Sequence, residues 1–177
     1  AIPLDLRLGA EVRVCIESLE LLKLGKVPFM GEHQGFRVVL LELPHGTVPV
    51  GTLRLVDKLV QMNIRPMIAH PERNKAIMDK PARIEPFLAA GCWLQLTAGS
   101  LTGDFGTSAQ KLAHMLMDDG SVRVVASDAH NASNRPPVLS KARAYIAKRW
   151  GADVANDVML RNPRQILGIG SAYQPIA

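Results

Sequence analysis

The chain has 177 residues, a formal net charge of +5 and 47% apolar residues, an ordinary composition for a single globular domain. Its charges are spread along the sequence and no apolar run approaches the length of a membrane span. We therefore expect neither a membrane span nor a nucleic-acid partner. Cys15 and Cys92 are single and far apart, which argues against a disulfide framework or a paired-cysteine zinc site and fits a reducing cytoplasm.

Apolar runs typical of buried strands alternate with amphipathic helical patterns along the chain. This alternation is the signature of βαβ units and predicts an α/β fold with a parallel sheet. The predicted strands cover residues 4–14, 36–42, 64–69, 93–97 and 122–126. The predicted helices cover residues 16–24, 50–62, 82–90, 108–117, 138–149, 152–160 and 163–167. Gly99, Gly103 and Gly106 predict a loop after the fourth strand.

The helix predicted over residues 50–62 has the clearest amphipathic pattern. Its apolar residues recur at helical spacing, so we expect one face of the helix to be buried. That face is predicted to contain Val50, Leu53, Val56, Leu59 and Val60.

Side chains able to bind a metal lie near the ends of four predicted strands. Glu11 lies in the first strand, Glu42 ends the second, His70 follows the third, and Asp128 and His130 follow the fifth. Parallel sheets and barrels place their ligands at the carboxyl ends of the strands, so these five side chains are expected to converge.

Mixed imidazole and carboxylate ligands suit zinc, manganese or iron, and a cluster of carboxylates favours more than one ion. Two neighbouring ions can lower the pKa of a bridging water and neutralise charge on a phosphoryl oxygen. The sequence contains no Walker-type phosphate loop, no Gly-x-Ser-x-Gly elbow and no paired-cysteine zinc motif. Metal-assisted hydrolysis is therefore the chemistry that the pattern favours.

Each of these residues also has a purely structural interpretation. A histidine after a strand is commonly a turn residue, Glu42 could lie on the surface, and Arg73 could be a solvated ion-pair partner. His33 and Cys92 are expected to be structural, the latter as an inert core thiol. The occurrence of five ligand-type residues at four strand ends favours a metal site over these alternatives.

Three segments together resemble a known superfamily. They are Ala69-His-Pro-Glu-Arg-Asn74, Ala98-Gly-Ser-Leu101 with Phe105-Gly106, and Ser127-Asp-Ala-His-Asn131 with Arg135-Pro-Pro137. In this order they are similar to the polymerase-and-histidinol-phosphatase (PHP) superfamily, and most of all to its bacterial protein-tyrosine phosphatases of capsule and exopolysaccharide synthesis. The resemblance extends from Glu11 to Asn162-Pro163, which is nearly the whole chain.

The resemblance implies a distorted (β/α)7 barrel with a site for two or three metal ions, often manganese, at its carboxyl-terminal face. The five residues at the strand ends match positions of metal ligands. Arg73 and Arg135 match positions that hold the substrate phosphate, and with His130 they form the implied catalytic set. The implied substrate is phosphotyrosine on the tail of a tyrosine kinase of polysaccharide synthesis, and an oligomer is compatible with the family.

One departure from the family pattern concerns the beginning of the chain. Such proteins open with a His-x-His motif on the first barrel strand, and here no histidine precedes His33. We therefore expect residues 1–177 to be a single PHP-type domain without its first strands, with about five strands present. A chain of this kind is expected to expose a sheet edge, or cover it with another copy, and to be inactive alone.

The first interpretation is a metal-dependent protein-tyrosine phosphatase. Alternatives are a PHP phosphoesterase acting on a small phosphate monoester and a non-catalytic remnant that binds a partner. A nucleic-acid-processing PHP domain is the least favoured. Manganese is the expected metal, and other divalent metals are compatible with the same residues.

Overall fold

The computed structural model describes residues 6–15 and 17–169. In this part of the chain, five parallel strands and one antiparallel strand form a single sheet. The strands are β1 (Glu11–Arg13), β2 (Gly31–His33), β3 (Phe36–Glu42), β4 (Ile64–Ala69), β5 (Trp93–Thr97) and β6 (Val122–Ala126). The parallel strands lie in the order β1-β3-β4-β5-β6, and β2 pairs antiparallel with β3. Each parallel strand thus lies beside its predecessor, which is the winding of a (β/α) barrel and not of a doubly wound sheet.

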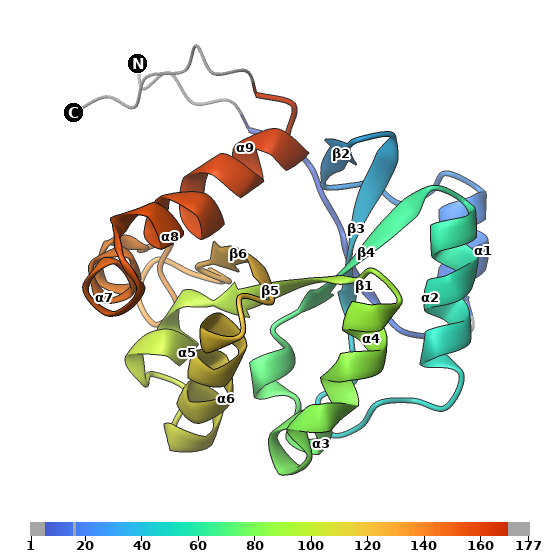
Figure 1. Ribbon diagram of the computed structural model, residues 1–177. Helices are drawn as coiled ribbons and strands as arrows, with labels where there is room; N and C mark the ends of the chain where they lie inside the picture. Colours follow the sequence, from blue (N-terminus) through green and yellow to red (C-terminus); the bar gives the residue numbers. More distant parts are fainter. Residues whose placement is uncertain (1–5, 16, 170–177) are drawn as a thin grey trace.

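Helices follow one another around the outside of the strands, from α1 and α2 beside β3 to α7 beyond β6 (Figure 1). The α-helices are α1 (Ser18–Lys23), α2 (Thr52–Gln61), α3 (Lys75–Asp79), α4 (Glu85–Ala89), α5 (Ala98–Thr102), α6 (Thr107–Asp118), α7 (Ser140–Trp150), α8 (Ala152–Asn156) and α9 (Asn162–Ile166). Two 3-10 turns, η1 (Pro71–Arg73) and η2 (Pro81–Ile84), and a π-helical turn, η3 (Asp157–Arg161), complete the connections. None of the described helices is both long enough and apolar enough to cross a membrane.

The predicted α/β fold with a barrel-type parallel sheet is confirmed, and the described strands leave the barrel open. Among the described residues, β1 pairs only with β3, and β6 pairs only with β5. The number of parallel strands agrees with the five expected from the sequence.

The two faces of the sheet carry two apolar clusters of unequal size. The larger cluster lies between the sheet and the connecting helices and includes Leu41, Leu94 and Phe87. The smaller one lies on the opposite face, where Ile166 of α9 packs with Val38, Met67 and Val124. Successive strand residues point to opposite faces, so each buried strand contributes to both clusters.

Helix α9 approaches β2 at Gly31 so closely that no side chain fits there. A Cβ atom at Gly31 would lie 1.9 Å from the carbonyl oxygen of Ile166. Glycine at this position therefore allows the end of α9 to cover the inner face of the sheet.

At the amino-terminal ends of the strands, two arginines stack on one indole ring. The Cζ atoms of Arg65 and Arg123 lie 5.2 Å and 4.7 Å from the ring centroid of Trp93, and His33 meets the same ring edge-on at 5.4 Å. Arg65 donates to the Gly91 carbonyl. We call Arg65, Arg123 and Trp93 the amino-end cluster.

Several element predictions need correction. The strand predicted over residues 4–14 is a strand only at Glu11–Arg13; residues 1–5 lie outside the described residues. The buried face of α2 contains Thr52, Val56 and Leu59. Val50 is fully exposed and Leu53 is 37% exposed. Both were wrongly predicted to be buried. Val50 precedes the helix, which begins only at Thr52, after Gly51 in a left-handed conformation, and Leu53 lies in the first turn outside the buried face.

Three short elements were missed. Strand β2 joins β3 through a two-residue turn in which Gln34 and Gly35 both have positive φ, 52° and 78°. Helix α3 begins after Asn74, whose side-chain oxygen accepts from the Ile77 N–H. Helix α5 occupies the first part of the segment that was predicted to be a loop. The helix predicted over residues 152–160 instead changes from α8 to the π-helical turn η3.

Candidate active site

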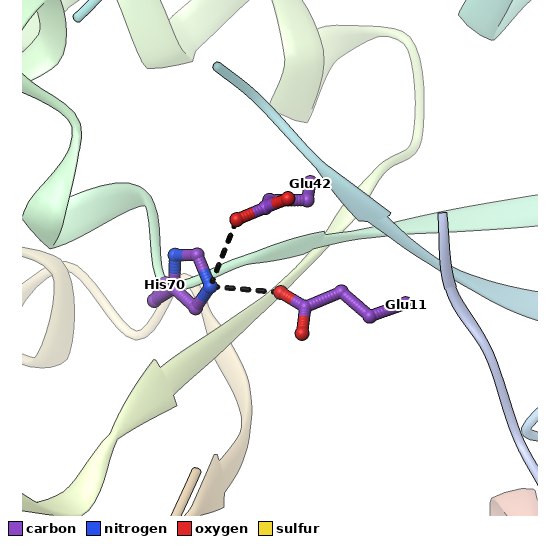
Figure 2. Close-up of side chains that lie close together, drawn as sticks. All are labelled: Glu11, Glu42 and His70. Atoms are coloured by element: carbon purple, nitrogen blue, oxygen red, sulfur yellow. Dashed lines mark hydrogen bonds and ion pairs between the residues drawn. The ribbon is translucent and has the colours of Figure 1, made fainter. Parts of the chain in front are cut away.

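Three side chains from neighbouring strands meet at the carboxyl-terminal end of the sheet (Figure 2). His70 Nε2 lies 2.8 Å from Glu11 Oε1 and 4.0 Å from Glu42 Oε1. One ligand atom from each of the three residues lies within 4.8 Å of the others. Register explains this meeting, because β1 and β4 both pair with β3 and bring residues 59 positions apart in sequence to one place.

The backbone turns sharply at His70, immediately after β4. His70 has a left-handed conformation, with φ of 30° and ψ of 54°, and its carbonyl accepts from the Arg73 N–H in η1. The Asn74 side chain then donates to the carbonyls of Pro44 and Thr47. These bonds join the turn after β4 to the loop after β3, so the ends of two site-forming strands are held together.

A second group lies at the ends of β4 and β6, where two arginines share one carboxylate. Arg73 Nη1 and Arg135 Nη2 both donate to Oδ2 of Asp128. The Asp128 side chain is only 13% exposed and its backbone is left-handed, with φ of 51°. Two guanidinium groups directed at a single anionic oxygen can also bind an oxygen of a phosphate group.

One aromatic ring contacts both of these arginines. The centroid of Phe105 lies 4.4 Å from Cζ of Arg73 and 5.6 Å from Cζ of Arg135. A Cβ atom at Gly99 would lie 2.9 Å from Cε2 of Phe105, so glycine there leaves room for the ring. We call Arg73, Arg135 and Phe105 the carboxyl-end cluster.

A buried carboxyl group, missed in the sequence analysis, supports this end of the sheet. Glu72 Oε1 accepts from the Thr97 N–H at 3.0 Å and from the Ser100 hydroxyl at 2.7 Å. Burial raises the pKa of Glu72 above its ordinary value, although both hydrogen bonds act in the opposite direction. Glu72 thereby ties the turn that carries His70 and Arg73 to the start of α5. From the sequence alone Glu72 looks like an ordinary charged residue, because its partners lie 25 and 28 positions away, in β5 and α5.

The other two predicted ligands take different positions. Asp128 is engaged by the two arginines, and His130 is 55% exposed, with Nδ1 2.9 Å from the Asp128 carbonyl oxygen. The structure thus brings Glu11, Glu42 and His70 together, as expected. The roles of all five residues in metal binding stay predictions.

The chemistry of the three clustered residues fits a divalent metal ion. Two carboxylates and one imidazole form a donor set suited to zinc, manganese or iron. Burial, the largest single influence, lowers the pKa of His70, but the hydrogen bond and charge of Glu11 and the charge of Glu72 more than offset it and raise that pKa. The acidic groups around His70 thus favour the cationic form of its ring.

A family model described as "Capsular polysaccharide synthesis, CpsB/CapC" matches residues 1–168. The chain belongs to the CpsB/CapC family. CapC of Staphylococcus aureus is 36% identical over 138 residues, which are 78% of this chain and 53% of CapC. The tyrosine-protein phosphatase CpsB of Streptococcus pneumoniae is 29% identical over 164 residues, covering 90% of this chain and 66% of CpsB.

A solved CpsB/CapC structure confirms the fold. It comes from crystal structures of YwqE from Bacillus subtilis and CpsB from Streptococcus pneumoniae, described as metal-dependent tyrosine phosphatases. It superposes with a TM-score of 0.81 at 27% identity, covering 96% of this chain and 68% of that one. The chain thus spans between half and two thirds of the length of the curated CpsB/CapC relatives named above.

Proposed function

We propose that this chain carries the phosphate-handling face of a metal-dependent phosphomonoester hydrolase that acts on phosphotyrosine in a protein substrate. The observation that supports the proposal most strongly is the proximity of two features at the carboxyl ends of the strands. The Glu11, Glu42 and His70 cluster offers metal ligands. Arg73, three residues after His70, and Arg135 are directed at one anionic oxygen.

The proposed metal site uses the carboxylates and imidazoles at the strand ends. Glu11, Glu42 and His70 hold a divalent ion, with manganese proposed, and Asp128 and His130 are proposed as further ligands. When bound, the metal would lower the pKa of a water molecule and neutralise charge on the phosphoryl group.

Arg73 and Arg135 bind the phosphate oxygens and oppose the charge that develops as the ester bond breaks. Phe105 keeps both guanidinium groups at their positions through its ring face. In the present structure the carboxylate of Asp128 shows how two guanidinium groups can surround a single oxygen.

The relatives support the substrate and the setting of this proposal. CpsB of Streptococcus pneumoniae and YwqE of Bacillus subtilis are named tyrosine-protein phosphatases. We infer that the substrate is a phosphotyrosine-bearing protein of capsule or exopolysaccharide synthesis, with the tail of a tyrosine kinase as the proposed partner. We place the reaction in the cytoplasm.

Hydrolysis of a phosphotyrosine peptide and of histidinol phosphate by the full-length protein tests the proposal. We expect manganese-dependent release of phosphate from the peptide, loss of this activity with a chelator, and recovery when manganese is added back. Preference for histidinol phosphate would favour a small-molecule phosphoesterase. Binding of a phosphotyrosine peptide without turnover would favour a non-catalytic remnant.

A further inference from the structure

A pocket of about 270 Å³ lies beside Arg135, between the loop that joins α5 to α6 and the segment that leads from β6 into α7. Its lining includes Phe105, Ser127, Arg135, Pro136 and Val138. Two of these residues, Phe105 and Arg135, belong to the carboxyl-end cluster. The pocket therefore adjoins the carboxyl-end cluster.

The walls of this pocket expose apolar surface that the fold itself does not cover. Phe105 is 36% exposed and Val138 is 56% exposed, and both line the same pocket although they lie 33 positions apart in sequence. Pro136 adds a further apolar surface. Concave apolar surface beside a few well-placed polar groups is typical of sites that bind the organic part of a ligand.

The loop that carries Phe105 is held in place by its own hydrogen bonds. Asp104 donates its N–H to the Gly99 carbonyl at 2.8 Å, and its carboxylate accepts from the Thr102 hydroxyl at 3.0 Å and from Lys141 at 3.2 Å. The missing Cβ at Gly99 gives the ring its place. The pocket wall is thus formed before any ligand arrives, which lowers the entropic cost of binding.

We propose that this pocket receives the aromatic ring of the phosphorylated substrate, and that Phe105 and Val138 select aryl over alkyl phosphates. The inference rests on the proposed phosphate-binding role of Arg73 and Arg135. Arg135 donates to Asp128 on one side and lines the pocket on the other. A phosphate bound by this guanidinium would lie beside the pocket that Arg135 and Phe105 both line.

Val138 offers the sharpest test because its exposed side chain lines the pocket and carries no group that could bind the phosphate itself. Val138→Asn makes the wall polar without adding charge, and Val138→Trp fills the pocket. Val50, an exposed valine outside this pocket, provides the matched controls Val50→Asn and Val50→Trp. Thermal unfolding of all four variants shows whether the fold is unchanged.

The measurement is the affinity of the manganese-loaded chain for phenyl phosphate, methyl phosphate and inorganic phosphate by calorimetry. We expect phenyl phosphate to bind about tenfold more tightly than methyl phosphate, a factor equal to about 1.4 kcal/mol. Both Val138 variants should lose most of this preference and keep their affinity for inorganic phosphate within about twofold, since the arginine pair is untouched. The Val50 variants should behave like the parent chain.

Two results would overturn the proposal. The first excludes the ring pocket alone, and the second also excludes the phosphate site. If phenyl and methyl phosphate bind equally, or if the Val138 variants keep the preference, the pocket does not hold the ring, and the phosphate site stands. If the parent chain binds none of the three phosphates, the phosphate site itself is wrong and the pocket proposal is wrong with it.

Discussion

Two ends of the same sheet carry nearly the same arrangement, an aromatic ring contacted by two arginines. At the amino end Arg65 and Arg123 stack on Trp93, and at the carboxyl end Arg73 and Arg135 stack on Phe105. The ring-to-guanidinium distances fall between 4.4 Å and 5.6 Å in both clusters.

The clusters differ in what the guanidinium groups face. Arg73 and Arg135 converge on a carboxylate oxygen. Arg65 donates to a backbone carbonyl and Arg123 to a side-chain amide, and no ion pair joins either to a carboxylate in the described part of the chain. Stacked arginines alone are therefore no sign of an active site. Convergence on an anion beside the Glu11, Glu42 and His70 cluster is the feature that separates the two ends.

The largest expected effect is on manganese affinity, and it compares a histidine at the carboxyl end of the sheet with one at the amino end. His70→Ala removes one of the three proposed metal ligands, and we expect the affinity for manganese to fall by at least about 100-fold. His33→Ala should leave this affinity within about twofold, because His33 lies against the Trp93 ring at the amino end, away from the three clustered residues. The manganese affinity of both variants is measured by titration, with the free ion detected by its electron paramagnetic resonance signal. Equal binding by the two variants would show that His70 is a turn residue only.

A pair of arginine-to-lysine variants tests the same contrast with charge preserved. Arg73→Lys loses the forked donor geometry, and we expect the affinity for phosphate to fall about tenfold while metal content is unchanged. Arg65→Lys should keep the phosphate affinity and instead lower stability by about 1 kcal/mol, through the lost stacking and the bond to Gly91. Calorimetry and chemical unfolding separate the two outcomes. Loss of metal in Arg73→Lys would instead assign that arginine to holding the ligands.

Two glycine variants test the backbone positions that lie against Phe105 in the carboxyl-end cluster and Arg65 in the amino-end cluster. Gly99→Ala places a Cβ 2.9 Å from the Phe105 ring, and the displaced ring should reduce phosphate affinity by about threefold. Gly91→Ala, near Arg65, should leave the affinity unchanged and cost about 1 kcal/mol of stability, because Gly91 has φ of 83°. The same binding and unfolding measurements apply. An unchanged affinity in Gly99→Ala would show that the loop adjusts freely.

The smallest effect concerns access to the amino-end cluster. Cys92, the residue before Trp93, is buried, and burial raises the pKa of its thiol to about 12. It therefore stays protonated at pH 8, and only the thiolate reacts readily with alkylating reagents. We expect exposed Cys15 to be alkylated and Cys92 to be spared, as read by mass spectrometry of the intact protein. Rapid alkylation of both cysteines would mean that solvent reaches Cys92 through local opening of the structure at the amino end of the sheet.

Most of the parallel strands and longer helices could be predicted from the sequence, since their apolar runs are long. The strand at Phe36–Glu42 was predicted with its observed bounds, and the burial of Cys92 was confirmed. Strand β2 has only three residues and begins with glycine, so its pairing with β3 creates a strand that local propensity does not indicate. Gln34 has a positive φ in a two-residue hairpin turn, where asparagine is the usual residue. Glutamine at this position hid the sequence signal of the turn.

The site was predicted in part because its residues lie in or directly after neighbouring parallel strands, where topology alone brings them together. Glu11, Glu42 and His70 are of this kind. The roles of Glu72 and Phe105 could not be predicted, since both depend on contacts with partners 25 or more positions away in the sequence. Such contacts leave no periodic pattern in the sequence.

The left-handed backbone at His70 and Asp128 has an evolutionary consequence. Both residues directly follow the turn out of a strand with φ of 30° and 51°, a region that histidine and aspartate occupy less readily than glycine. Their side chains therefore come at some cost in stability, which the proposed roles of both residues in the active site would explain. In a descendant released from selection for that chemistry, positions 70 and 128 are where glycine or asparagine should become fixed early. Such replacements would identify inactive members of the family from sequence alone.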